Sequence, residues 1–185
     1  MSCIVKSDTQ PRIATIAIAK LIVTAVVVLL ASSSNLYAAD ATAQVQLNVA
    51  KAGPRAVESL TERGILRDYR FAWMSMAQAL EFNTVDPLEG PFAGEAKKWL
   101  RETVANQQRS GISQRYMNQN HQLEAVFYAP EGDVMELHDT AEYQLQVSDG
   151  GKLIHDEHVI VHYVILMTPA ADQWVIRQLQ AVPQF

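Results

Sequence analysis

Residues 135–147 constrain the fold most, because apolar and polar side chains alternate there over more than a dozen positions. A period of two places alternate side chains on opposite faces of a strand, so this stretch predicts a half-buried β-strand. Asp149-Gly150-Gly151 follows and predicts a tight hairpin turn, since glycine supplies the positive φ that such turns need. The apolar positions of the alternation are Met135, Leu137, Ala141, Tyr143, Leu145 and Val147.

Further strands are predicted on both sides of this one. Residues 155–167 are rich in β-branched side chains, and Thr168–Asp172 predicts a turn before a last strand at Trp174–Val182. Residues 122–129 form an earlier strand that ends in Pro130-Glu131-Gly132-Asp133. The four strands follow one another closely, which favours an antiparallel meander.

Helices are predicted before the strands. From Val57 to Phe82 apolar residues recur at steps of three and four, and a second such stripe covers Gly94–Gln108. We expect Gly64 to break or kink the first helix near its start. The stripes predict that the tryptophans, Trp73, Trp99 and Trp174, belong to the core. Helices packed on one face of a curved four-strand antiparallel meander make an α+β domain over residues 57–185.

The N-terminal segment, residues 1–39, differs from the rest. Basic residues precede an unbroken apolar run at Leu21–Ala31, and small-residue sites follow at Ala39-Asp40-Ala41. This order is typical of a secretory signal peptide. The alternative is an uncleaved anchor over residues 13–31, just long enough to cross a bilayer. Both place the domain in the periplasm, free or tethered to the inner membrane, with residues 40–56 as a linker.

Composition excludes several classes of function. The one cysteine, Cys3, precedes the apolar run, so the domain has no disulfide, no cysteine nucleophile and no cysteine-ligated metal. Of the 15 basic and 20 acidic residues, residues 40–185 hold 12 and 19, a formal charge of −7. Such a surface argues against nucleic acid as the partner. We find no phosphate-binding loop or hydrolase motif and expect no cofactor.

Two kinds of residue are candidates for chemistry. Asp139 shares the presumed inner face of its strand with Tyr143, and an inward carboxylate in an apolar cone could serve as a general base. Trp99, Tyr143 and Leu145 are the candidates to line a ligand pocket. The histidines around position 158 do not predict a metal site, because His158 and His162 lie roughly 13 Å apart on a strand and His155 points the other way.

The order of elements resembles the nuclear transport factor 2-like superfamily of cone-shaped α+β folds. The similarity covers about Leu66 to Phe185 and is carried by the Asp149-Gly150-Gly151 hairpin, the long strand through Tyr163 and the terminal strand at Gln173–Ile176. A narrower similarity is to the inner-membrane scaffold proteins of type IV secretion of the Dot/Icm kind. Its carriers are Trp73–Ala77, Leu80–Asn83 and Ala181–Phe185.

Three functions follow as hypotheses. The resemblance implies a non-catalytic periplasmic domain that binds other envelope proteins, as a scaffold component of a secretion or conjugation apparatus. The second hypothesis is a periplasmic protein that binds a small molecule in an apolar cone. The third is an enzyme of the isomerase or dehydratase type, in which Asp139 faces inward and acts with Tyr143.

Overall fold

The structure, a computed structural model, describes residues 43–185. The predicted signal or anchor region, residues 1–39, lies outside the described residues. The elements in chain order are β1 (Gln44–Asn48), α2 (Ser59–Phe82), a 3₁₀ turn η1 (Asp86–Leu88), α3 (Gly94–Ser110), β2 (Ile112–Tyr128), β3 (Met135–Asp149), β4 (Lys152–Ala170) and β5 (Gln173–Val182).

The strands form one sheet in the order β1-β2-β3-β4-β5. The α+β class is confirmed, but the prediction of four strands, all antiparallel, is wrong. Residues 44–48, within the expected linker, form a fifth strand that pairs parallel to β2 at Asn120–Glu124. The strand is short and reads Gln-Val-Gln-Leu-Asn. Val45 is nevertheless buried, and a two-residue alternation over five positions suffices for an edge strand.

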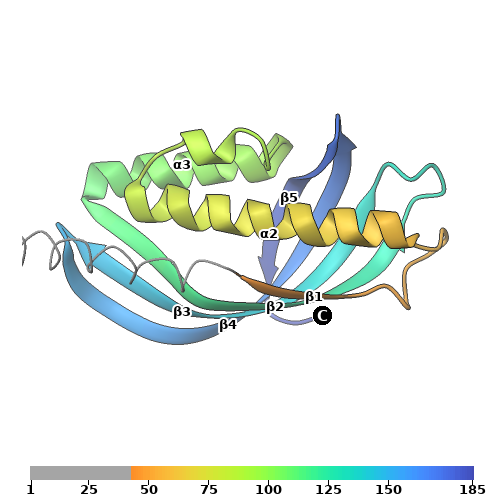
Figure 1. Ribbon diagram of the computed structural model, residues 1–185. Coiled ribbons are helices and arrows are strands. Elements are labelled where there is room, and N and C mark those ends of the chain that lie inside the picture. Colours follow the sequence, from red (N-terminus) through yellow and green to blue (C-terminus); the bar gives the residue numbers. More distant parts are fainter. Residues whose placement is uncertain (1–42) are drawn as a thin grey trace, which may run out of the picture. The chain divides into compact units, whose positions relative to one another are not determined.

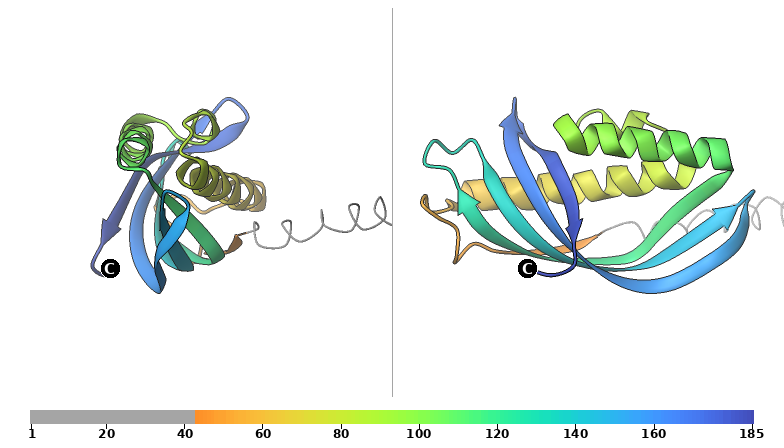
Figure 2. Two further views of the ribbon diagram at one scale, coloured as in Figure 1. Left: turned by 90° about the vertical axis from the view of Figure 1, so that its left-hand side faces the viewer. Right: turned by 180° about the vertical axis from the view of Figure 1, so that it is seen from behind.

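Both helices lie on the concave face of the curved sheet, as Figure 1 and the two views of Figure 2 show. Helix α2 is continuous through Gly64, so the predicted break is wrong; a β-carbon built there would lie 3.7 Å from the Trp174 ring, an ordinary packing distance. The helix ends at Asn83, which adopts the left-handed conformation typical of helix C-termini.

The strand bounds differ most at β2. The sequence predicts a strand from residue 122, whereas β2 begins at Ile112. Its first part is rich in Gln, Asn and Ser and half-buried, and a register shift between Met117 and Asn120 interrupts its pattern. The hairpin turn is confirmed, because Gly150 and Gly151 have φ values of 53° and 84° and join β3 directly to β4.

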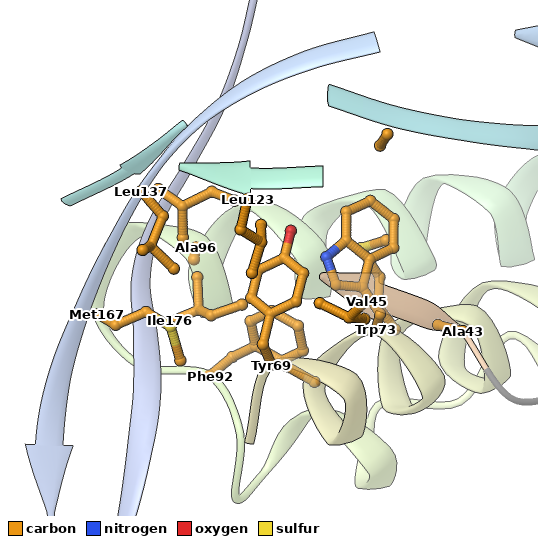
Figure 3. Close-up of a cluster of buried hydrophobic side chains, with 14 of the residues drawn as sticks. Ala43, Val45, Tyr69, Trp73, Phe92, Ala96, Leu123, Leu137, Met167 and Ile176 are labelled. Atoms are coloured by element: carbon orange, nitrogen blue, oxygen red, sulfur yellow. The ribbon is translucent and has the colours of Figure 1, made fainter. Parts of the chain in front are cut away.

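The core fills the space between the helices and the concave face (Figure 3). Trp73 is fully buried and Trp174 half-buried, as predicted. The prediction that Trp99 belongs to the core is wrong, since its side chain is 49% exposed. The buried stripe of α3 runs through Ala96, Leu100 and Val104, and Trp99 lies beside that stripe rather than on it.

Candidate functional site

A buried polar cluster joins α2 to the sheet. The hydroxyl of Tyr69 donates a hydrogen bond to Oδ2 of Asp139 (2.7 Å), and Nδ1 of His121 lies 2.8 Å from the same oxygen. The three residues come from α2, β3 and β2 and all have 0% exposure. Because a buried carboxylate needs donors, the two bonds hold Asp139 in the apolar interior and fix the helix against both strands.

Aromatic rings surround this cluster. The Trp73 ring centroid lies 4.3 Å from that of His121, and in Figure 3 the hydroxyl of Tyr69 points away from its own helix. Tyr143 stands on the same face of β3 as Asp139, with its hydroxyl 3.2 Å from that of Tyr163. The cluster therefore continues as a band of tyrosines along the concave face.

Burial keeps these tyrosines protonated. Desolvation, followed by the charge of Asp139, raises the pKa of Tyr69 well above its ordinary value. Desolvation also raises the pKa of Tyr116, Tyr143 and Tyr163. None of the four phenols can act as a base near neutral pH, so the cluster offers one carboxyl and one imidazole for proton transfer.

The cluster is closed to solvent. Oδ1 of Asp139, Nε2 of His121 and Nε1 of Trp73 are buried and have no hydrogen-bond partner among the described residues. These three atoms are the free polar groups of the cluster, and a substrate would have to reach them through side chains packed to 0% exposure. The cluster is therefore a buried polar network in which two contacts to Asp139 are made and three polar atoms are left unbonded.

The structure places the predicted site residues as follows. Asp139 and Tyr143 face inward, as expected, and Leu145 continues the same face of β3 in a half-buried position. Trp99 does not join them, because it lies on α3 and is largely exposed. The three candidates for a pocket therefore do not line one common space.

Sequence reasoning missed Tyr69 and His121. In the sequence, Tyr69 is one of the apolar residues of the helical stripe over Val57–Phe82, and nothing marks it as a polar contact. His121 falls just before the strand predicted from residue 122. A signal existed: His121, Leu123 and Ala125 alternate with polar residues, so β2 could have been extended back by this period. Their contact with Asp139 depends on strand register, which the sequence does not contain.

The histidines of β4 lie as predicted for a strand. Register pairs His158 with Gln144 and His162 with Thr140, on the convex face of the sheet, whereas His155 faces the other side. His158 bonds Glu142 (2.9 Å) and His162 bonds Thr140 (3.2 Å). No three His, Cys, Asp or Glu side chains within residues 43–185 are placed to hold a metal ion.

The second notable feature is the open part of β4. Strand β5 pairs with β4 only from His162 to Ala170, whereas β3 pairs with β4 along nearly its whole length. No described strand covers the other edge of β4 from Lys152 to Val161. Figures 1 and 2 show this hairpin extending past β5. We call residues 152–161 the open arm.

Every side chain from Lys152 to His158 is exposed, and so is Ile160. The apolar side chains Leu153, Ile154 and Ile160 are 49%, 56% and 60% exposed. Both faces of the open arm are thus accessible from Lys152 to His158, whereas Val159 and Val161 pack against the core. Unpaired backbone groups beside exposed apolar side chains form a template for another strand.

The open arm is acidic near its centre. Asp156 accepts hydrogen bonds from Gln144 and Gln146, which lower its pKa and keep it charged. Glu157 lies next to it on the opposite face. Lys152, at the turn, is the basic residue of the arm.

Two other surfaces complete the description. An open hollow of about 450 Å³ lies on α3, lined by Gly94, Lys97, Lys98, Arg101 and Glu102, and it includes none of the cluster residues. Phe185 stacks on His138 and meets His162 edge-on, so the C-terminal residue covers part of the convex face. Within residues 43–185, neither helix has the length and hydropathy to cross a bilayer.

Comparison with known proteins identifies a fold and no family. No protein-family description and no curated protein sequence matches this chain. The intermembrane-space region of the chloroplast protein ARC6 is similar in structure, with a TM-score of 0.57, 14% identity, and coverage of 70% of this chain and 98% of that one. The likeness shows a shared α+β fold.

A protein of unknown function with a cystatin-like fold, from Nostoc punctiforme, also matches in part. Its TM-score is 0.38 at 14% identity, with 69% of this chain and 95% of that chain covered.

Proposed function

We propose that the chain is a non-catalytic, extracytoplasmic protein-interaction domain whose partner binds along the open arm. The observation that carries the proposal is the ten-residue edge of β4 where β5 stops short, with every side chain from Lys152 to His158 exposed. A strand of the partner would extend the sheet in line with β5.

The partner we propose is an extended, basic segment of another envelope protein. Main-chain hydrogen bonds would supply affinity, and lysine or arginine would lie opposite Asp156 and Glu157. Apolar side chains at alternate positions would pack against Ile154 and Ile160 on the convex face. A chain with a secretory or anchor segment would meet such a partner in the periplasm, as a scaffold component of a type IV secretion or conjugation apparatus does.

Adjacent prolines in the open arm test this. In an antiparallel ladder neighbouring residues direct their N–H groups to opposite edges. Of His158→Pro and Val159→Pro, one breaks a bond to β3, and the other removes only a donor at the open edge. The edge variant is identified as the one whose free energy of unfolding is unchanged. When the tagged full chain is affinity-purified from detergent-extracted membranes, we expect the partner to be absent from the edge variant.

Trp99→Asp is the matched control, since it changes an exposed aromatic residue on α3 and leaves the open arm intact. Recovery of the same partner from both proline variants would overturn the proposal. A dimer of the purified chain that the same proline separates would show that the occupant is a second copy, and would also overturn it.

One observation favours a second candidate, an enzyme of the isomerase or dehydratase type. Asp139 faces inward, and its Oδ2 lies 2.8 Å from Nδ1 of His121, so a carboxyl and an imidazole are in direct contact. Asp139→Asn would then abolish turnover while the chain stays folded. Retention of a measured activity in this variant would exclude Asp139 as the base.

A further inference from the structure

The solvent face of α2 carries apolar and basic side chains together. Leu60, Phe71 and Phe82 are 77%, 48% and 64% exposed and repeat every eleven residues, close to three helical turns, so they lie in one line. Met74, 42% exposed, lies beside that line. At 1.5 Å per residue the line is about 33 Å long.

Arginines are interleaved with these residues. Arg63 and Arg67 fall on the same side of the helix and are exposed, but Arg67 forms an ion pair with Asp68 (2.6 Å). Arg70, at the border of this side, donates a hydrogen bond to the carbonyl of Val45 (3.0 Å). The acidic residue of this face, Glu81, lies 3.5 Å from Arg115. Among the described residues, Arg63 is the cation of this face without a carboxylate partner, and it lies among exposed apolar side chains on a chain whose net charge is −5. We call Leu60, Arg63, Arg67, Phe71, Met74 and Phe82 the α2 face.

We infer that the α2 face docks on a lipid bilayer that contains anionic headgroups. Arginines beside exposed aromatic and aliphatic side chains are the pattern of helices that lie in a membrane interface. A straight line of apolar residues fits a plane better than a pocket. An unpaired arginine near such a surface is attracted to anionic headgroups.

Within residues 43–185, no helix or strand covers this face: Figure 1 shows α2 at the near side of the domain, with no other described element across its length. The open arm belongs to β4, at the other side of the sheet from β1, so the membrane contact stands apart from the proposed protein contact. A retained segment 13–31 would hold the domain within about 40 Å of the bilayer, given the reach of the dozen residues that follow it.

A fluorescent probe on the α2 face tests the inference in the full chain. Gln78→Cys, in a Cys3→Ser background, places an environment-sensitive dye among the face residues, and Lys98→Cys on α3 is the matched control site. The protein is reconstituted with vesicles of phosphatidylethanolamine and phosphatidylglycerol or of phosphatidylcholine alone, each containing a lipid-attached quencher.

We expect quenching at position 78 with the anionic vesicles, little at position 98, and loss of the effect in high salt. Phe71→Ser with Met74→Ser should weaken the anionic binding by about tenfold or more. Equal quenching at both sites, or none at position 78 with anionic vesicles, would overturn the inference. A change in dye fluorescence at position 78 that occurs in native membranes but with neither kind of vesicle would assign the α2 face to a protein partner and overturn the inference.

Discussion

The two ends of β4 are built from one strand but differ in every physical respect. From Tyr163 to Met167 its inward side chains pack against the helices, next to Asp139 and its two donors. From Lys152 to His158 every side chain is exposed and one edge has no described partner. The closed half holds the domain together, and the open half is free to bind.

The largest expected effect is on the closed half. Asp139→Ala would leave the hydroxyl of Tyr69 and the ring nitrogen of His121 buried without an acceptor, so we expect a loss of about 3–5 kcal/mol in the free energy of unfolding. Urea unfolding followed by circular dichroism measures it. Asp156→Ala, in the open arm, should cost less than about 0.5 kcal/mol. Equal effects would mean that the cluster does not stabilise the core.

The next effect is on pH dependence. Burial raises the pKa of Tyr69 above that of the unfolded chain, so its contribution to stability is present below pH 10 and is lost as the pH rises further. The free energy of unfolding should fall by about 1.4 kcal/mol per pH unit above pH 10 for each such buried tyrosine. Tyr69→Phe should make this slope shallower. A stability independent of pH between 9 and 11 would contradict the closed packing.

Hydrogen exchange compares the two halves directly. Amides of β4 that face β5, within residues 162–170, should exchange at least about a hundredfold more slowly than the edge amides of residues 152–161, because the latter have no described strand partner. Mass spectrometry of short peptides or NMR resolves the two sets. Similar protection in both would show that the open arm is already covered.

The smallest expected effect is at Gly64, where α2 passes Trp174. A β-carbon there would make an ordinary contact, so Gly64→Ala should stabilise the fold by about 0.5–1 kcal/mol through helix propensity. Thermal unfolding measures the change, with Gly111→Ala as the opposite case, since φ at Gly111 is 72°. A destabilised Gly64→Ala variant would show that α2 and β5 pack more tightly than the distances indicate.

Sequence periodicity predicted both helices, four of the five strands, with β2 starting too late, and the inward face of Asp139. These features depend on local patterns: apolar residues at steps of three to four predict the helices, and a period of two predicts the strands. It failed where the structure depends on partners distant in sequence. β1 is too short to show its pattern, β2 begins in a polar stretch, and Trp99 lies just beside the buried stripe. The contact between Tyr69, His121 and Asp139 depends on strand register, whereas the end of β5 at Val182, which leaves the open arm uncovered, agrees with the predicted strand.

Site-specific photocrosslinking in intact cells tests the role of the open arm most directly. A photoreactive amino acid is placed at Ile154, at His158 and, as a control, at Glu102 on α3. We expect the same crosslinked polypeptide from both arm positions, none from Glu102, and loss of the adduct when the edge proline is added. Adducts from all three positions, or adducts that survive the edge proline, would contradict binding along the open arm.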